Sequence, residues 1–466
     1  MRRQTFALYF GNRGFFPESL IASARTTLRN RIEALGFDTL LLEEDATRFG
    51  AVETVAEGET YAAFLRRNEG RYDGVVLSLP NFGDETGAIA ALRDCGTPIL
   101  VHAWPDEIGR MDFEHRRDAF CGKFSVLDVF HQYGLPCTTL PPHTVHPDDP
   151  AFAGQMERFA SVCRIVKGMR RLTVGAVGAR TTAFKTVRFD ELALQRHGIT
   201  TETLDLSELF QRVRDITEAG ERYALRRERL LGYTNWPGVP AEKVAMLTRL
   251  SLALDDVITE YGLDCLALRC WNEIETELRV SPCVLLSELN DRGVTAACEL
   301  DVCNAVPMRA LALASGQPAT CLDWNNNYGG DPDKCILFHC GPVPQSLMAG
   351  KGRVTDHRMF AKSYGAGCGW GCNEGRIGAF PMTFASAKTE NGRLSFYLGE
   401  GAFTEDPIEE GFFGCGGVAR IGNLQQKLLA IGRKGYRHHV GVTRGLEAEA
   451  LREAFTDYLG YDLETI

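Results

Sequence analysis

Residues 5–44, TFALYFGNRGFFPESLIASARTTLRNRIEALGFDTLLLEE, contain a strand, a helix and a second strand in succession. An apolar strand-like run at 5–10 leads through a loop into a stretch of helical periodicity at 19–37, which a glycine ends, and a second apolar run follows at 38–44. The alternation continues through helical stretches and strand-like runs at 61–70, 73–80, 86–96 and 97–105. Strands that alternate with helices predict a parallel sheet covered on both faces.

A second unit of the same kind begins at RLTVGAVGAR, residues 171–180. Its helices include PAEKVAMLTRLSLALDDVITEYG (240–262), and its expected strands are LTVGAVG (172–178), ITTETLDL (199–206), CLALRC (265–270), AACELDV (296–302), ATCLDW (319–324) and KCILFHC (334–340). The break between the two units falls at about residues 150–170, beside PPHTVHPDDP, a segment rich in Pro, His and Asp.

The character of the sequence changes after about residue 345. Glycine becomes dense, and short alternating runs such as IGAFPMTFASAK (377–388) and GRLSFYLGEGAF (392–403) indicate β-structure with tight turns. A helical stretch at 446–460 closes the chain. We therefore predict an α/β fold with two doubly wound, Rossmann-like domains, 1–165 and 166–345, and a β-rich domain, 346–466.

Composition and charge exclude several classes of function. The net charge of −10 argues against a nucleic acid or an anionic membrane as partner, because both favour basic patches. No run reaches about 18 uninterrupted apolar residues, and the start of the chain lacks the apolar run of a signal peptide, so we expect a cytoplasmic protein.

The 15 cysteines lie largely in apolar runs, which indicates buried reduced thiols. GAVGAR (175–180) lacks the third glycine and the acidic residue of a dinucleotide-binding fingerprint.

Five polar residues stand at or beside apolar runs in the second half of the chain: Glu299, Asp323, His339, His438 and His439. Ligands of open α/β sheets bind beyond the carboxyl ends of the strands, so these residues can meet in one crevice. Carboxylates with imidazoles suit Mn²⁺, Co²⁺, Fe²⁺ or Mg²⁺ better than a structural zinc site. Each residue also has an ordinary interpretation, as a helix cap, a turn residue or a hydrogen-bonded core histidine. On a strand, the rings of His438 and His439 would point to opposite faces.

A second polar set follows the strands of the first unit. Asn12 and Arg13 follow its first strand, Asn81 its third and Trp104 its fourth, and Gln132 lies in DVFHQYGLP. We expect these residues to contact a substrate; the alternative is ordinary loop chemistry.

These segments together resemble the L-fucose isomerase and L-arabinose isomerase superfamily. The similar segments are PCVLLSELNDRGVTAACELDV (282–302), ATCLDW (319–324), KCILFHCG (334–341), HHVGV (438–442) and ALRCWNEIE (267–275). The resemblance implies two α/β domains followed by a β-barrel-like domain. Two departures leave the sugar open: the chain is shorter than typical L-fucose isomerases, and its ligand set, Glu299 with Asp323, differs from the two glutamates of the L-arabinose enzymes.

The resemblance implies a metal-dependent aldose–ketose isomerase that acts on a pentose, deoxyhexose or hexose-derived sugar through an enediol. Glu299 and Asp323 would be catalytic, and the same two residues with His339, His439 or both would bind the metal, expected to be Mn²⁺. The substrate would contact His438 and the first unit's polar set. The resemblance also implies a homo-oligomer, a trimer or hexamer, whose N-terminal loops complete the neighbour's site.

Other functions remain open from the sequence. A metal-dependent aldolase or lyase would use a similar enediolate, and a sugar-binding protein would need no catalysis. Arg13, Lys185 and Arg376 are cations that would favour an acidic or sulfonated sugar such as sulfoquinovose, or they are surface residues.

Overall fold

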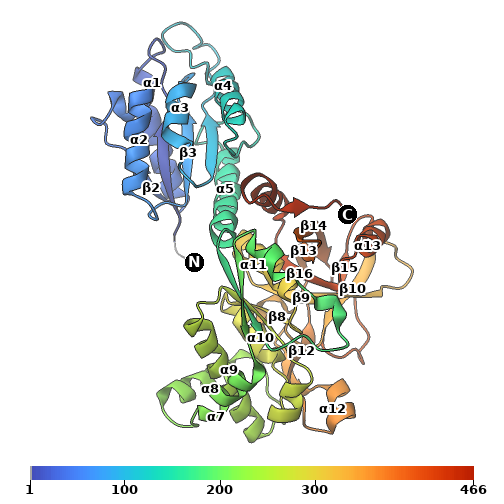
Figure 1. The fold of residues 1–466 in the computed structure, drawn as a ribbon. Coiled ribbons are helices and arrows are strands. Elements are labelled where there is room, and N and C mark those ends of the chain that lie inside the picture. The colour runs from blue at the N-terminus through green and yellow to red at the C-terminus, as the bar shows by residue number, and fades with distance from the viewer. Residues whose placement is uncertain (1–2) are drawn as a thin grey trace. The chain divides into compact units, whose positions relative to one another are not determined.

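The computed structural model describes residues 3–466, and the chain divides into two compact units, Met1–Lys167 and Gly168–Ile466 (Figure 1). Within the described part of the first unit, one parallel sheet has the strand order β2-β1-β3-β4. Its strands are β1 (Thr5–Phe10), β2 (Asp38–Leu41), β3 (Gly74–Leu79) and β4 (Ile99–Ala103). Its helices are α1 (Ser19–Ala34), α2 (Val55–Arg67), α3 (Glu85–Leu92), α4 (Ala119–Gln132) and α5 (Pro150–Met169), which runs past the end of the unit.

Strand β1 explains why helices cover both faces of this sheet. Its six residues are all buried, and successive side chains point to opposite faces. Ala7 and Tyr9 pack with residues of α2, α3 and α4, whereas Phe6, Leu8 and Phe10 pack with residues of α1 and α5. A strand buried on both sides is apolar throughout, as TFALYF is. The predicted doubly covered parallel sheet is confirmed.

The second unit begins with another parallel sheet, of strand order β6-β5-β7-β8. The strands are β5 (Leu172–Val177), β6 (Ile199–Leu204), β7 (Cys265–Leu268) and β8 (Thr295–Cys298). The helices are α6 (Glu191–Gln195), α7 (Leu206–Asp215), α8 (Glu221–Tyr233), α9 (Ala241–Glu260), α10 (Cys283–Asp291) and α11 (Val302–Ser315). In both sheets the strand order reverses between the first and third strands, where open α/β sheets bind ligands.

Within residues 168–466, six antiparallel strands close into a barrel, because β14 pairs with both β13 and β15. Its strands are β9 (Ala319–Asn327), β10 (Lys334–His339), β13 (Phe380–Glu390), β14 (Arg393–Phe403), β15 (Cys415–Arg420) and β16 (His439–Arg444). Around it lie β11 (Arg353–Asp356), β12 (Trp370–Arg376), β17 (Asp462–Leu463), α12 (Arg358–Tyr364), α13 (Leu424–Arg433) and α14 (Ala448–Glu453). The β-rich character predicted for the C-terminal part is confirmed.

The strands expected at 319–324 and 334–340 do not extend the second parallel sheet; that assignment is wrong. They are β9 and β10 of the barrel, paired antiparallel with each other. The physical reason is the short connection NNYGGDPD between their apolar parts, because parallel neighbours need a crossover of a dozen or more residues. Barrel strands therefore begin before the expected boundary at residue 345. Helix α11 joins the two parts of the unit, since it packs on β7 and β8 as well as on β13 and β16.

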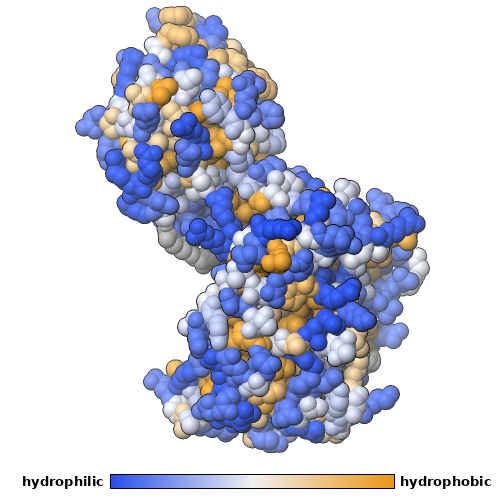
Figure 2. All heavy atoms as spheres, in the orientation of Figure 1, coloured by the Kyte–Doolittle hydropathy of each residue, from blue (hydrophilic) through white to orange (hydrophobic). Residues whose placement is uncertain are grey.

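On the face drawn in Figure 2, hydrophilic side chains predominate over both units, and smaller apolar patches interrupt them. Across residues 3–466, no helix combines the length and the apolar character needed to cross a lipid bilayer.

Candidate active site

Glu299 and Asp301 lie where strand β8 ends and helix α11 begins. Glu299 and Leu300 both adopt left-handed backbone conformations, each with φ of 61°. This conformation is costly for bulky residues and is concentrated at functional sites. Asp301 is fully buried and caps α11, since its carboxylate accepts a hydrogen bond from the backbone N–H of Asn304. Because the backbone turns at these two left-handed residues, the two carboxylates have different contacts. That of Asp301 caps α11, whereas that of Glu299 lies beside His439 of the barrel.

The barrel brings Asp323 and His439 to the same place. They are paired residues in neighbouring strands β9 and β16, and Asp323 is also paired with Phe338, which precedes His339 on β10. His439 Nε2 lies 3.1 Å from Glu299 Oε2 and 3.5 Å from Asp323 Oδ1. The rings of His339 and His439 have centroids 5.8 Å apart. The structure thus brings together the acidic and imidazole residues that the sequence selected.

His438 also faces this cluster. Its Nε2 lies 3.7 Å from Asp323 Oδ1, and ligand atoms of Glu299, His438 and His439 all lie within 4.8 Å of one another. The prediction that only one of the two adjacent histidines points into the site is wrong. The alternation of a strand does not apply, because β16 begins at His439 and His438 precedes it.

Asp301 and Arg437 contact this cluster, and the sequence interpretation missed both. Asp301 Oδ2 accepts a hydrogen bond from His439 Nδ1 at 2.8 Å, and its other oxygen pairs with the buried Arg437 guanidinium. A carboxylate can only accept, so the proton of a neutral His439 ring lies on Nδ1 and the lone pair lies on Nε2, facing Glu299 and Asp323. A carboxylate that fixes a histidine in this way is typical of the surroundings of metal sites. The sequence signal that could have indicated Asp301 is its position directly before the helical run that forms α11.

The two carboxyl groups at the centre differ in acidity. Burial raises the pKa of Glu299, but the hydrogen bond from His439 and the positive charges that His439 and His339 carry when protonated outweigh it, so the net pKa is below the ordinary value. Burial also raises the pKa of Asp323, and there the neighbouring imidazoles do not outweigh it, so its net pKa is above the ordinary value. Opposite shifts in neighbouring carboxyl groups are the pattern of an acid and a base with separate tasks.

The donor atoms of this cluster have the chemistry of a ligand set for a divalent cation. Asp323 Oδ1, His339 Nε2 and His439 Nε2 are buried without a hydrogen-bond partner in the described part of the chain. Buried polar atoms are seldom left unpaired, so such atoms in one place need an explanation. Carboxylate oxygens with an imidazole nitrogen suit Mn²⁺, Co²⁺, Fe²⁺ or Mg²⁺.

The predicted residues of the first unit form a separate polar cluster at the carboxyl ends of β1 and β3. Asn81 donates a hydrogen bond to Asn12 at 2.6 Å, and Asn12 donates to Glu53 at 3.1 Å. Arg13 pairs with Glu85 and covers the ring of Phe82. Asn12 and Asn81 are buried, and the cluster lies at the point where the strand order reverses.

Trp104 and Gln132 have other surroundings in the same unit. Trp104 is buried, and its Nε1 donates to Ser78 Oγ, which in turn contacts His102 Nδ1. Gln132 is exposed at the last turn of α4, where its amide donates to Asp128. Neither residue has a contact that shows a role in substrate binding, and that role stays a prediction.

Comparison with known proteins gives two matching family models. The model of the fucose/sulfoquinovose isomerase N-terminal domain matches residues 7–170, and the model of the L-fucose isomerase C-terminal domain matches residues 337–466. The sulfoquinovose isomerase of Priestia aryabhattai is 24% identical over 409 residues, 86% of this chain and 87% of the relative. The sulfoquinovose isomerase of Alkalicoccus urumqiensis is 26% identical over 305 residues, 64% of this chain and 66% of the relative. With the two matched domains in the order that the fold shows, this chain belongs to the fucose isomerase-like superfamily of sugar isomerases.

Proposed function

We propose that the chain converts a sulfonated aldose, such as sulfoquinovose, into the corresponding ketose, with a divalent cation held by Glu299, Asp323 and His439. The observation that carries the proposal is the orientation of His439. Its Nδ1–H donates to Asp301, so its Nε2, 3.1 Å from Glu299 and 3.5 Å from Asp323, is the ring nitrogen that faces two carboxylates. Although burial lowers the pKa of His439, these carboxylates favour a positive charge at that nitrogen, and the net pKa is well above its ordinary value; a divalent cation can take the place of the Nε2 proton.

The two carboxyl groups supply the proton transfers that an aldose–ketose isomerisation needs. Glu299, whose pKa is lowered, stays ionised and takes the proton from C2. The electrons of the C2–H bond form the C1–C2 double bond, and the carbonyl electrons move to O1, which takes a proton from Asp323. In the second half, Asp323 takes the proton of O2 and Glu299 returns its proton to C1. When bound, a divalent cation polarises the carbonyl and stabilises the negative charge that develops on its oxygen.

A cation of the chain beside the site supports an anionic sugar. Of the three cations considered from the sequence, Arg13 pairs with Glu85, and Arg376 donates to backbone oxygens of Glu409 and Phe412. Lys185 is exposed, and no ion pair engages it within residues 3–466. It follows Phe184, whose ring lies 5.5 Å from the ring of His438. We therefore assign Lys185 to the sulfonate.

The substrate test compares sulfoquinovose with quinovose, which differs only in lacking the sulfonate. We expect the Mn²⁺-loaded protein to form a ketose of unchanged carbon number, detected by NMR, and to prefer sulfoquinovose. Lys185→Gln should raise KM for sulfoquinovose about two- to fivefold and leave KM for quinovose unchanged, since one exposed charge–charge contact is lost. Lys351→Gln, at another exposed lysine, is the matched control. Equal turnover of both sugars would remove the sulfonate from the proposal, and fragments in place of a ketose would indicate a lyase.

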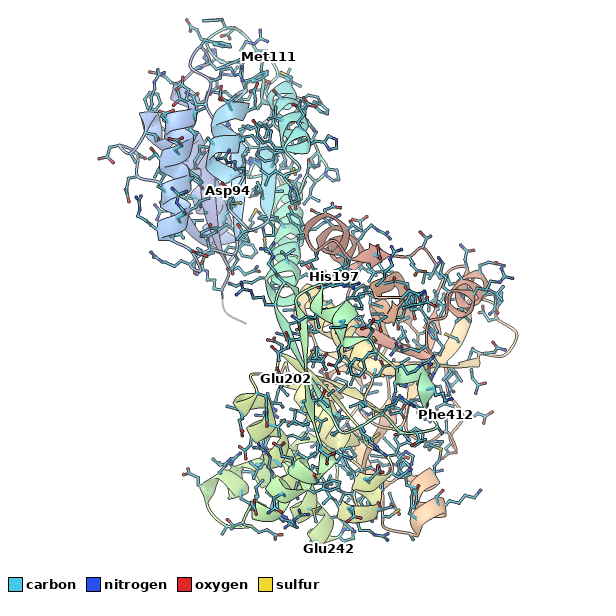
Figure 3. All side chains as sticks on the ribbon, viewed as in Figure 1. Asp94, Met111, His197, Glu202, Glu242 and Phe412 are labelled. Carbon is cyan, nitrogen blue, oxygen red and sulfur yellow. The ribbon has the colours of Figure 1, made fainter. Side chains whose placement is uncertain are left out.

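The proposed enzyme is a homo-oligomer, and the surface of the first unit supports this. Several large apolar side chains are more than half exposed there: Phe15, Ile108, Met111, Phe113, Phe120 and Phe124. Met111, labelled in Figure 3, lies in the loop between β4 and α4. Exposed aromatic side chains in such numbers are typical of protein interfaces. Light scattering should give a trimer or hexamer, and Phe113→Asp with Phe120→Asp should lower its mass; a monomeric wild type would contradict the assignment.

A further inference from the structure

His339 ends strand β10 inside the candidate active site. Its side chain is 2% exposed, and it lies on the side of the site formed by Asp323 and His439. By residue type it is as good a metal ligand as His439. The two histidines differ, however, in what their Nδ1 atoms contact.

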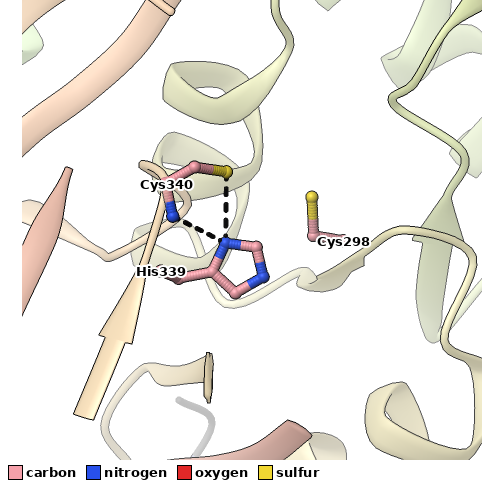
Figure 4. Close-up of side chains that lie close together, drawn as sticks. All are labelled: Cys298, His339 and Cys340. Atoms are coloured by element: carbon pink, nitrogen blue, oxygen red, sulfur yellow. Dashed lines mark hydrogen bonds between the residues drawn. The ribbon is translucent and has the colours of Figure 1, made fainter. Parts of the chain in front are cut away.

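The Nδ1 atom of His339 is an acceptor. The backbone N–H of Cys340 donates to it at 2.9 Å, and the Cys340 sulfur lies 3.2 Å away (Figure 4). A backbone amide can only donate, so the lone pair of the His339 ring is on Nδ1. The proton of the neutral ring is then on Nε2. This tautomer is the opposite of the one that Asp301 imposes on His439.

The Nε2–H of His339 is therefore a buried donor without an acceptor of normal geometry among residues 3–466. It shares its surroundings with Cys321 and His439, since ligand atoms of the three residues lie within 4.8 Å of one another. A thiol sulfur is a weak acceptor, and the His439 lone pair faces the two carboxylates. A nitrogen that carries a proton cannot bind a metal ion, whereas it can donate to an oxygen that enters the site.

We infer that His339 binds the sugar and not the metal: its neutral ring donates the Nε2–H to the carbonyl oxygen O1 of the substrate. This inference rests on the proposed function and deepens it. The ring keeps its proton throughout, and its hydrogen bond strengthens as negative charge develops on O1. Neutral imidazole acts in this way in other enzymes that form enediols. A preorganised donor of this kind contributes more in the transition state than in the ground state.

The side of His339 that faces Cys340 offers a different ligand set. Cys298 and Cys340 sulfurs and a His339 ring nitrogen lie within 4.8 Å of one another, a grouping that a thiolate-binding metal would use. The Cys340 backbone N–H already occupies the Nδ1 lone pair, so such a metal would have to break that hydrogen bond. This favours the substrate-donor role over a thiolate site.

The same substitution at the two histidines tests the inference. Gln places a neutral side-chain amide near the Nε2 position of histidine, so it keeps a donor but is a poor metal ligand. We expect His339→Gln to bind one Mn²⁺ per chain with an affinity within about threefold of wild type, and His439→Gln to lose about 10- to 100-fold in affinity. Mn²⁺ is titrated by electron paramagnetic resonance, which needs no sugar. If His339→Gln loses Mn²⁺ as His439→Gln does, His339 is a ligand and the inference is wrong.

Nitrogen NMR of the wild-type protein gives an answer that does not depend on folding of a variant. With ¹⁵N-labelled histidine and Mg²⁺, His339 should show a protonated Nε2 and an unprotonated Nδ1, and His439 the reverse. A protonated Nδ1 at His339 would overturn the inference. So would a Co²⁺–thiolate absorption band that Cys340→Ser abolishes. Both measurements are independent of turnover, so they remain decisive even if sulfoquinovose is not the substrate.

Kinetics then separates the donor role from packing. His339→Leu removes the donor and should lower kcat about 10²- to 10³-fold with Mn²⁺ content unchanged. His339→Gln should recover a large part of that loss, because it restores an N–H at the same place. Equal losses in the Leu and Gln variants, with native circular dichroism and full Mn²⁺ content, would show that no hydrogen bond from this position contributes.

Discussion

Asp301→Asn changes one charge behind the proposed metal site and leaves the first contacts of the site in place. The carboxylate accepts from His439 Nδ1 at 2.8 Å, pairs with Arg437 and caps α11. Asparagine is a good helix cap and nearly the same size, so the helix should survive. The amide, however, can turn its NH₂ group toward His439, which allows the opposite tautomer and removes the lone pair from Nε2.

Two magnitudes follow from these contacts. Loss of a carboxylate that orients a metal-bound histidine lowers metal affinity about 10- to 100-fold, or about 1.4–2.7 kcal/mol. Arg437 and Asp301 side chains are only 5% and 0% exposed, so the substitution also leaves a buried guanidinium unpaired. Breaking a buried ion pair by removing one partner costs about 3–5 kcal/mol of the free energy of unfolding.

Mn²⁺ titration and urea denaturation measure the two effects separately. In the double variant Asp301→Asn, Arg437→Met, stability should return in large part because the unpaired cation is gone, while Mn²⁺ affinity stays low. Asp205→Asn is the matched control, since Asp205 caps α7 in the same way and is exposed, with a hydrogen bond to Ser207. Wild-type Mn²⁺ affinity in a folded Asp301→Asn protein would refute the role given to Asp301.

Three further outcomes are expected. Glu299→Gln and Asp323→Asn should each lower kcat about 10²- to 10⁴-fold while the free energy of unfolding stays close to wild type, and wild-type turnover in either variant would remove that residue from the mechanism. Burial lowers the pKa of His102 to about 3, below the unfolded value of about 6.5, so stability present above pH 6.5 should be lost as pH falls toward 3. Between pH 7 and pH 5 this amounts to about 2 kcal/mol in urea denaturation, which His102→Gln should abolish. Arg13→Ala should lower activity, and mixing it with Glu299→Gln should restore part of it if subunits share sites; no rescue after verified subunit exchange would contradict sharing.

The parallel sheets could be predicted from the sequence because each strand carries its own signal. A run such as TFALYF, apolar at every position and followed by an amphipathic helix, has few other stable arrangements than a strand buried on both faces. The barrel strands β9 and β10 carry the same local signal, and their pairing is decided by β16 and β15, about a hundred residues away. Only the short connection between β9 and β10 carried the information that they are antiparallel.

The site residues were predictable as residue types beside strand ends, but their chemical states were not. Nothing in the sequence relates Asp301 to His439, because their contact is made by the barrel closing against α11. The same is true of His339, whose tautomer depends on the backbone of Cys340. The failed expectation for His438 came from extending strand alternation one residue too far, since the start of β16 is set by its pairing with β9.

Isomerisation of sulfoquinovose in D₂O decides whether the cluster of Glu299, Asp323 and His439 is a metal-dependent isomerase. The protein is stripped of metal, divided, and assayed by NMR with and without restored Mn²⁺, beside Glu299→Gln with Mn²⁺. We predict ketose only in the Mn²⁺-restored wild type, with deuterium at C1, because Glu299 exchanges the proton it takes from C2 with solvent. Full turnover by the metal-free protein, or full turnover by Glu299→Gln with Mn²⁺, would contradict a metal-dependent proton transfer at this site.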